Sequence, residues 1–266
     1  MCSGRNQEFD HEVLAIQIPC LLSQLKFRKT LQENYLSWHS SSLGRTMEML
    51  TFGHAGVPVL LFPTSMGSYH QNKDFHLLDS ISWFIDNGIV KVYCPDSVDE
   101  ASWYNKSIHP FDRVKTHMAY DKYIREEVYP LMANETGIGR IATAGCSFGA
   151  YHATNFAFRY PELVAYCFNM GGAFDIKMQM EGQYNDDTYY HNPIDFVVDA
   201  NHPDLWRMAI ILGVGEHDFC RAANEKLSAV LNGKGIDHWL DITPGGIHDW
   251  PDWRNMFPRY ISRINS

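Results

Sequence analysis

Several patterns that would assign this 266-residue chain to other protein classes are missing from its sequence. It has no run of Lys and Arg, and 31 acidic residues against 22 basic ones give a formal net charge of −9. That balance disfavours a phosphate backbone, so we expect no nucleic-acid partner. No apolar stretch is long enough to span a bilayer, so we expect no membrane partner. H-E-x-x-H and comparable ligand spacings are absent, so we expect no catalytic metal.

Cysteine is sparse, with six residues and no C-x-x-C pair. Cys94 and Cys167 lie in apolar runs, where a free thiol behaves as a small hydrophobic side chain. A disulfide framework is not expected in a chain of this size, which favours a reducing compartment. Residues 13–25 come nearest to a signal peptide, but acidic residues precede them and Gln and Pro interrupt them. We therefore expect a cytoplasmic protein.

The composition is that of an ordinary globular protein, 45% hydrophobic and 20% charged. This length permits one large α/β domain or two small ones. We find no internal repeat, low-complexity tract or linker. The pattern becomes regular only after about residue 30, so we expect an N-terminal extension over residues 1–30, of unassigned structure. A single domain is expected over residues 31–266.

Strand and helix patterns alternate along that domain. Residues 35–39 and 45–54 predict an antiparallel hairpin. Continuous apolar runs over residues 57–62 and 89–94 predict strands buried on both faces, as in parallel sheets. Further strands are predicted over residues 141–144, 164–170, 207–214 and 238–242. Helical patterns cover residues 75–87, 120–131, 148–160, 221–231 and 250–264. The alternation predicts an α/β fold with a mostly parallel central sheet flanked by helices.

Two segments do not follow this alternation. Residues 98–118 are long and rich in aromatic residues, and we expect them to shape a surface or a pocket. Trp103 and Tyr104 in this segment, with Tyr151 further on, are candidate pocket residues. Aromatic packing beneath a long loop is the alternative. Residues 173–206 carry many Asp, Asn, Gln and Tyr and predict a small lid-like insertion.

The most informative stretch is Gly145-Cys-Ser147-Phe-Gly149. A strand-like run enters it and a small-residue helical pattern follows, which is the context of a G-x-S-x-G nucleophile elbow. Gly145 and Gly149 let the strand and helix backbones approach each other. The helix N-terminus behind Ser147 presents unpaired N–H groups to developing negative charge. Taken alone, the motif fits a glycine-rich turn with a capping serine equally well.

Two later strand ends supply partners for Ser147. The strand over residues 207–214 runs into Gly-Glu-His-Asp218, and the strand over residues 238–242 leads to Gly-Ile-His248-Asp-Trp. Loops that follow parallel strands open at the same edge of a sheet. A serine needs a base, and the base needs an orienting acid. His248 is the candidate base and Asp218 the candidate acid.

Other carboxylates lie close in sequence to the candidate acid and the candidate base. Glu216 precedes Asp218 by two residues, and Asp249 adjoins His248. Either is near enough to compete for the imidazole.

The three motifs together resemble the α/β-hydrolase superfamily, and the esterase-D-like esterases in particular, whose relatives include mycolyl-transferase-type folds. The resemblance covers roughly residues 34–264 in element order. It implies a single α/β-hydrolase domain in which Ser147 is the nucleophile, Asp218 the acid and His248 the general base. No cofactor is expected.

The resemblance also implies an oxyanion hole. One donor is expected to be the N–H of Phe148, and the other an N–H in the loop after residues 57–62. Many relatives have a His-Gly sequence in this loop, whereas this chain has Pro63-Thr-Ser65-Met66-Gly. The second donor is therefore Ser65 or Met66. Because a backbone donor tolerates any side chain, this departure does not argue against catalysis.

We expect a serine esterase that acts on a small or medium ester through an acyl-enzyme. An acyltransferase with the same triad is one alternative, in which an alcohol or amine intercepts the acyl group. A non-catalytic binding protein on a hydrolase scaffold is the other. The expected partner is a small-molecule ester, and self-association into a homo-oligomer stays open.

Overall fold

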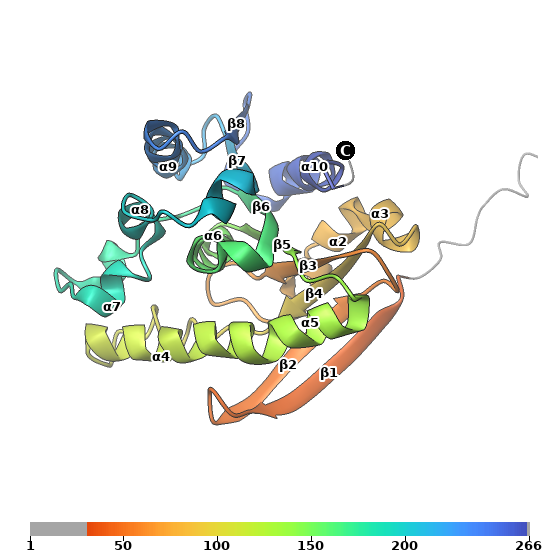
Figure 1. Ribbon diagram of the computed structural model, residues 1–266, viewed down its shortest axis with the longest axis horizontal. Coiled ribbons are helices and arrows are strands. Elements are labelled where there is room, and N and C mark those ends of the chain that lie inside the picture. Colours follow the sequence, from red (N-terminus) through yellow and green to blue (C-terminus); the bar gives the residue numbers. More distant parts are fainter. Residues whose placement is uncertain (1–30, 265–266) are drawn as a thin grey trace, which may run out of the picture. The chain divides into compact units, whose positions relative to one another are not determined.

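A single eight-stranded sheet forms the centre of the computed structural model, which describes residues 31–264. Its strands are β1 (Glu33–Ser40), β2 (Arg45–Phe52), β3 (Val57–Phe62), β4 (Val90–Pro95), β5 (Ile141–Cys146), β6 (Val164–Met170), β7 (Ala209–Gly215) and β8 (His238–Thr243). The spatial order is β1-β2-β4-β3-β5-β6-β7-β8. The pairs β1–β2 and β2–β4 are antiparallel, and all the others are parallel. The predicted hairpin and mostly parallel sheet are confirmed (Figure 1).

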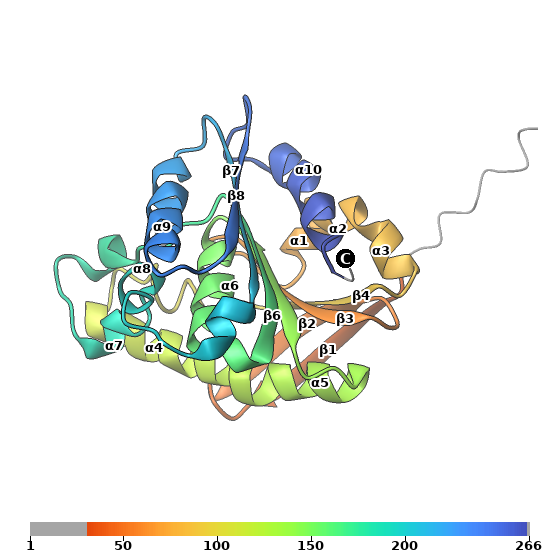
Figure 2. The ribbon, with the colours of Figure 1, turned by 45° about the horizontal axis from the view of Figure 1, so that its top comes forward.

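Helices cover both faces of this sheet (Figure 2). They are α1 (Gln71–Asp74), α2 (Leu77–Ser80), α3 (Ser82–Asp86), α4 (Pro110–Tyr123), α5 (Tyr129–Thr136), α6 (Phe148–Arg159), α7 (Asp186–Tyr189), α8 (Pro193–Phe196), α9 (Arg221–Gly233) and α10 (Trp250–Ile261). Helices α4, α6 and α9 bury apolar side chains against one face. Helices α2, α3 and α10 bury theirs against the other. The inner strands β3 to β7 are therefore largely buried, whereas the edge strand β1 is mostly exposed and β8 is half-buried.

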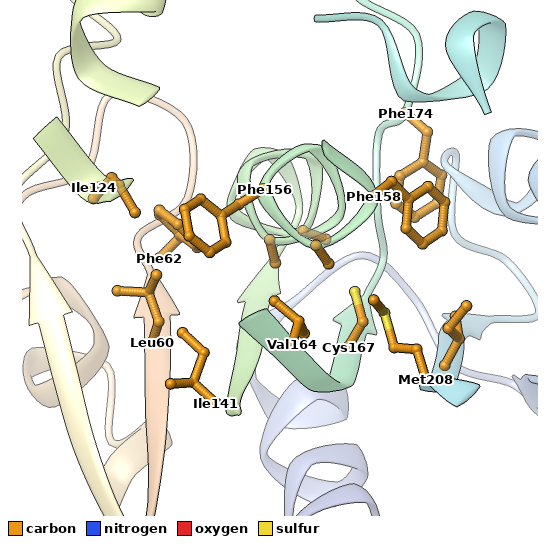
Figure 3. Close-up of a cluster of buried hydrophobic side chains, with 14 of the residues drawn as sticks. Leu60, Phe62, Ile124, Ile141, Phe156, Phe158, Val164, Cys167, Phe174 and Met208 are labelled. Atoms are coloured by element: carbon orange, nitrogen blue, oxygen red, sulfur yellow. The ribbon is translucent and has the colours of Figure 1, made fainter. Parts of the chain in front are cut away.

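The packing of α6 on the sheet brings the elbow serine to the end of β5. Ala150, Ala153 and Ala157 of α6 expose no surface, and such small side chains let the helix lie close to the strands. Larger side chains fill the space on either side, among them Leu60, Phe62, Ile141, Phe156, Val164 and Cys167 (Figure 3). Each large apolar side chain buried in this way contributes about 1.5–3 kcal/mol.

The sequence pattern predicted one continuous helix over residues 75–87, and this prediction is wrong. The structure has two short helices there, α2 and α3, and a third, α1, directly before them. His76 has φ +61° between α1 and α2, a left-handed conformation that no α-helix can contain. Ile81, at φ −113°, separates α2 from α3. The apolar spacing survives the second break because α2 and α3 still bury Leu77, Leu78 and Ile85 in the same core cluster.

The predicted long segment over residues 98–118 is a loop only in its first part. Helix α4 already begins at Pro110, with His109 as the N-cap residue whose side chain accepts from the Phe111 N–H. Proline at the first helical position is a helix-start signal. A π-helical turn, η2 (Ile124–Val128), then joins α4 to α5.

The insertion over residues 173–206 consists of short helical turns: η4 (Lys177–Met180), α7, α8 and η5 (Pro203–Arg207). Ile176 and Met180 are buried against Trp103 and Tyr151. The Tyr151 hydroxyl also donates to the backbone oxygen of His191 at 2.9 Å. The segment is thus joined to α6 through buried contacts.

The predicted extension over residues 1–30 lies outside the described residues. Within residues 31–264, no helix is both long and apolar enough to cross a membrane.

Candidate active site

The elbow holds Ser147 in a conformation that its neighbours impose. Ser147 has φ +55° and ψ −121°, which a non-glycine residue adopts only under strain. A Cβ on Gly145 would lie 2.2 Å from the carbonyl oxygen of Gly149. A Cβ on Gly149 would lie 2.5 Å from the backbone oxygen of Pro63. Only glycine fits at both positions, so the strand, the helix and the loop after β3 enclose the serine closely.

The three residues expected to form a triad are in hydrogen-bond contact. His248 Nε2 lies 2.9 Å from Ser147 Oγ, and His248 Nδ1 lies 2.8 Å from Asp218 Oδ1. The carboxylate is acceptor-only when ionised, so Nδ1 carries the ring proton and Nε2 is left to accept from the serine hydroxyl. Asp218 is itself held by the N–H of Cys220, which donates to Oδ1 at 2.7 Å.

The structure places the competing carboxylates elsewhere. Glu216 accepts from the Gly245 N–H at 2.9 Å, and this bond holds the pKa of Glu216 below its ordinary value. Asp249 is the N-cap residue of α10 and accepts from the Trp250 N–H at 2.7 Å. Of the three candidate acids, Asp218 is therefore the one whose carboxylate contacts the imidazole of His248.

The loop after β3 shows which amide is free to act as the second oxyanion donor. The Met66 N–H donates to Asp99 Oδ2 at 3.1 Å, so it is already occupied, and the expectation that Met66 serves as donor is corrected on this ground. Among residues 31–264, no acceptor is seen for the Ser65 N–H. The Phe148 N–H belongs to the first turn of α6, where backbone donors have no partner within the helix. These two amides, of Phe148 and Ser65, are the available pair.

The expected pocket aromatics lie mostly in the interior. Trp103 and Tyr151 expose no surface, so neither can line a substrate pocket, and that expectation is wrong for both. They pack with His117 beneath the loop, which is the alternative that the sequence left open. Tyr104 is partly exposed, and its hydroxyl donates to Ser65 Oγ at 2.9 Å.

Three exposed apolar side chains that sequence reasoning missed belong to loops of the site. They are Met66 in the loop after β3, Phe219 next to Asp218, and Ile247 next to His248, and each exposes more than half of its surface. The only sequence signal was their position beside residues that the sequence singled out as site candidates. Asp99 was also missed, since nothing near it in the sequence points to its contact with the loop after β3.

Among residues 31–264, one group of three His, Cys, Asp or Glu side chains brings possible metal-ligand atoms within 4.8 Å of one another. It consists of Asp218, Cys220 and His248. Burial and the charge of Asp218 raise the pKa of the Cys220 thiol to about 12, so the thiolate that a metal would bind is disfavoured. His248 Nδ1 and Asp218 Oδ1 already bind each other. The donor set fits an acid–base couple better than a metal.

A serine on a strained strand-to-helix elbow, an imidazole and a carboxylate on later loops, and a mostly parallel sheet of this strand order define an α/β hydrolase. The family model described as "Putative esterase" matches residues 84–264. The chain belongs to this esterase family, as its motifs predicted. A comparison with curated protein sequences finds no match.

Solved structures share this fold at low sequence identity. A ferulic acid esterase superposes with a TM-score of 0.70 at 17% identity, over 88% of this chain and 98% of that one. S-formylglutathione hydrolase FrmB from Staphylococcus aureus gives 0.67 at 14% identity, over 88% and 98%. The fluorophosphonate-binding serine hydrolase FphF from Staphylococcus aureus gives 0.70 at 16% identity, over 88% and 98%. At these identities the likeness concerns the fold.

Proposed function

We propose that the protein hydrolyses small or medium carboxylic esters through an acyl-enzyme on Ser147. The observation that carries this proposal is the unbroken hydrogen-bond chain from Ser147 Oγ through His248 to Asp218. A serine hydroxyl is a weak nucleophile unless an adjacent base takes its proton. His248 Nε2 lies at the distance required for that transfer, and Asp218 stabilises the imidazolium that results.

In the first half-reaction, Ser147 Oγ bonds to the ester carbonyl carbon while its proton passes to His248 Nε2. The electron pair of the carbonyl bond moves to oxygen, where the N–H groups of Phe148 and Ser65 stabilise it. Collapse breaks the bond to the alcohol, which leaves with the proton from His248. A water molecule then attacks the acyl group on Ser147 in the same way, which releases the acid and regenerates the serine.

The test is covalent labelling with a fluorophosphonate probe, read by intact mass and peptide mapping. We expect one adduct on Ser147 in the wild type, and its loss in His248→Ala. His217→Ala is the matched control, because His217 is an exposed neighbour that does not contact Ser147, and this variant should label normally. Ser147→Ala should lower turnover roughly 10⁶-fold. A folded wild-type protein that resists both large and small probes would contradict the proposal.

The substrate screen should separate hydrolysis from acyl transfer. Structural neighbours are named for ferulic acid and for S-formylglutathione, so a feruloyl ester and a short thioester belong beside simple aryl esters. Each assay is repeated with an added alcohol. Hydrolysis predicts that free acid remains the main product. Diversion of most product to the new ester would support the acyltransferase alternative instead.

A further inference from the structure

A second carboxylate–histidine pair is buried next to the elbow. Asp99, in the loop after β4, exposes none of its surface, and His152 of α6 exposes 3%. Asp99 Oδ1 lies 2.8 Å from His152 Nε2. A buried carboxylate is unfavourable unless charge and hydrogen bonds compensate it, so a pair in this position has a structural or functional reason.

The other oxygen of Asp99 reaches the oxyanion loop. Asp99 Oδ2 accepts from the Met66 N–H at 3.1 Å. Met66 is one of four non-glycine residues with positive φ among residues 31–264, at +53°, so its peptide needs an external restraint to keep this conformation. The preceding peptide carries the Ser65 N–H. Asp99 thus holds the peptide between Ser65 and Met66. The peptide before it, between Thr64 and Ser65, carries the N–H that stabilises the oxyanion in the proposed mechanism.

The rest of the loop is held at two further points. Gln71 Oε1 accepts from the Thr64 N–H at 2.8 Å, and the Ser97 hydroxyl donates to the Gly67 backbone oxygen at 2.7 Å. Ser65 therefore lies between restrained neighbours, while its own N–H is left without an acceptor among residues 31–264. Preorganised donors of this kind stabilise a transition state because they do not reorganise during the reaction.

His152 connects this arrangement to the elbow helix. Its ring stacks on Phe62 of β3 at 5.6 Å between centroids and lies edge-on to Phe148 at 5.2 Å. Phe148 supplies the first oxyanion donor, and His152 follows it by one helical turn on the same face of α6. The pair of Asp99 and His152 therefore spans the two segments that carry the two donors.

We propose that Asp99 and His152 are positioning residues that set the Ser65 N–H relative to the Phe148 N–H in the oxyanion hole. This inference rests on the proposed esterase function. Neither side chain touches the reacting atoms. Asp99 acts through the Met66 peptide, and His152 acts by holding the other carboxylate oxygen of Asp99.

The variants are Asp99→Ala, Asp99→Asn and His152→Gln, with Asp96→Asn as the matched control. Asp96 lies in the same loop and its carboxylate also accepts a backbone N–H, but from Tyr69 at 3.3 Å. Asp99→Ala should lower kcat about 10- to 100-fold with KM little changed, because the donor matters mainly in the transition state. Asp99→Asn keeps an oxygen for the Met66 N–H and should lose less. Asp96→Asn should keep its kcat.

A boronic acid inhibitor separates positioning from a loss of folded enzyme. Its tetrahedral adduct places an oxygen in the hole, so its Ki should rise by the same factor as kcat/KM falls across the Asp99 variants. A purely structural role would lower the number of sites titrated by the fluorophosphonate and leave Ki unchanged. Folded Asp99→Ala with wild-type Ki and kcat, or an equal loss in Asp96→Asn, would overturn the inference.

Amide hydrogen exchange over residues 63–68 gives a readout that needs no turnover. Exchange should be faster in Asp99→Ala than in the wild type, and unchanged in Asp96→Asn. Equal exchange in all three proteins would overturn the positioning role even if the wild type is an active esterase. Absence of Ser147 labelling in the wild type would instead refute the proposed function, and the oxyanion role of this pair with it, whatever the exchange shows.

Discussion

The ring of Phe219 lies 4.0 Å, between centroids, from the imidazole of His248. Phe219 nevertheless exposes 79% of its surface, so it covers the imidazole on one side while its other side faces solvent. An exposed aromatic ring beside the proposed general base is an available contact for an apolar part of a ligand.

We expect Phe219→Ala to raise KM for aryl esters about 3- to 10-fold, because it removes apolar contact area worth about 1 kcal/mol. KM for a methyl or ethyl ester should change less. Trp83→Ala is the control, because Trp83 is a comparably exposed aromatic side chain, on α3. Steady-state kinetics on both ester types checks this, and an equal change in KM for both would contradict a contact with the aryl group.

Asp218→Asn should lower kcat by about 10⁴-fold, because an amide cannot hold His248 in the tautomer that accepts the serine proton. Glu216→Gln is the matched substitution, and kcat should stay within about threefold, as for an ordinary surface change. Kinetics on one ester decides between the two carboxylates. A larger loss in Glu216→Gln would assign the acid to Glu216.

Gly171→Ala should disable the site without unfolding the protein. A Cβ there would lie 2.8 Å from Asp218 Oδ2 and 3.0 Å from His248 Nδ1, so the acid–base pair must shift. We expect kcat to fall about 100-fold, as for a displacement of about 1 Å. Gly137→Ala is the control, since Gly137 has a similar φ, +71° against +62°, and nothing within 4 Å.

Both glycine variants should lose about 1–2 kcal/mol of stability, because alanine is strained at positive φ. Only Gly171→Ala should lose activity per titrated site. Urea unfolding and active-site titration measure the two effects separately. Comparable activity in the two variants would mean that the triad tolerates the added methyl group.

Stability should fall at mildly acidic pH because of buried histidines. Burial lowers the pKa of His191 from 6.5 to about 3 and that of His117 well below its ordinary value. Below pH 6.5 the unfolded chain binds protons that the folded chain does not. The contribution of these histidines to stability is therefore fully present above pH 6.5 and decreases below it. Each histidine contributes a loss of about 1.4 kcal/mol per pH unit as the pH drops below 6.5.

His191→Gln should reduce the dependence of the unfolding free energy on pH by the contribution of one histidine. His39→Gln, an exposed position on β1, should leave it unchanged. Urea unfolding followed by circular dichroism between pH 7 and pH 5 gives the slopes. A slope in His191→Gln equal to that of the wild type would show that His191 is not a buried neutral group.

The sheet was the most predictable part of the fold. The strands over residues 57–62 and 164–170 match β3 and β6 to the residue, because strands buried on both faces appear as continuous apolar runs. The break at His76 was not predictable. A left-handed conformation at a residue other than glycine has no local signal in the sequence, and the apolar spacing continues across it.

The residues of the candidate site were likewise only partly predictable from the sequence. Ser147, Asp218 and His248 follow strand ends, so parallel topology alone predicts that they meet. Asp99 was missed because its partners lie 33 and 53 residues away and the contacts form across separate loops. Trp103 was misplaced because an aromatic residue in a long loop has the same local sequence whether it lines a pocket or packs inward.

The bond between Ser147 and His248 joins residues 101 positions apart in the chain. Each crossover from β5 to β8 must be completed before the two side chains meet, and such non-local pairings form slowly during folding. The helices, by contrast, depend on local contacts. We therefore expect refolding from urea to restore helical ellipticity before it restores labelling of Ser147. In this protein, labelling of Ser147 therefore shows that the last strand, β8, has joined the sheet.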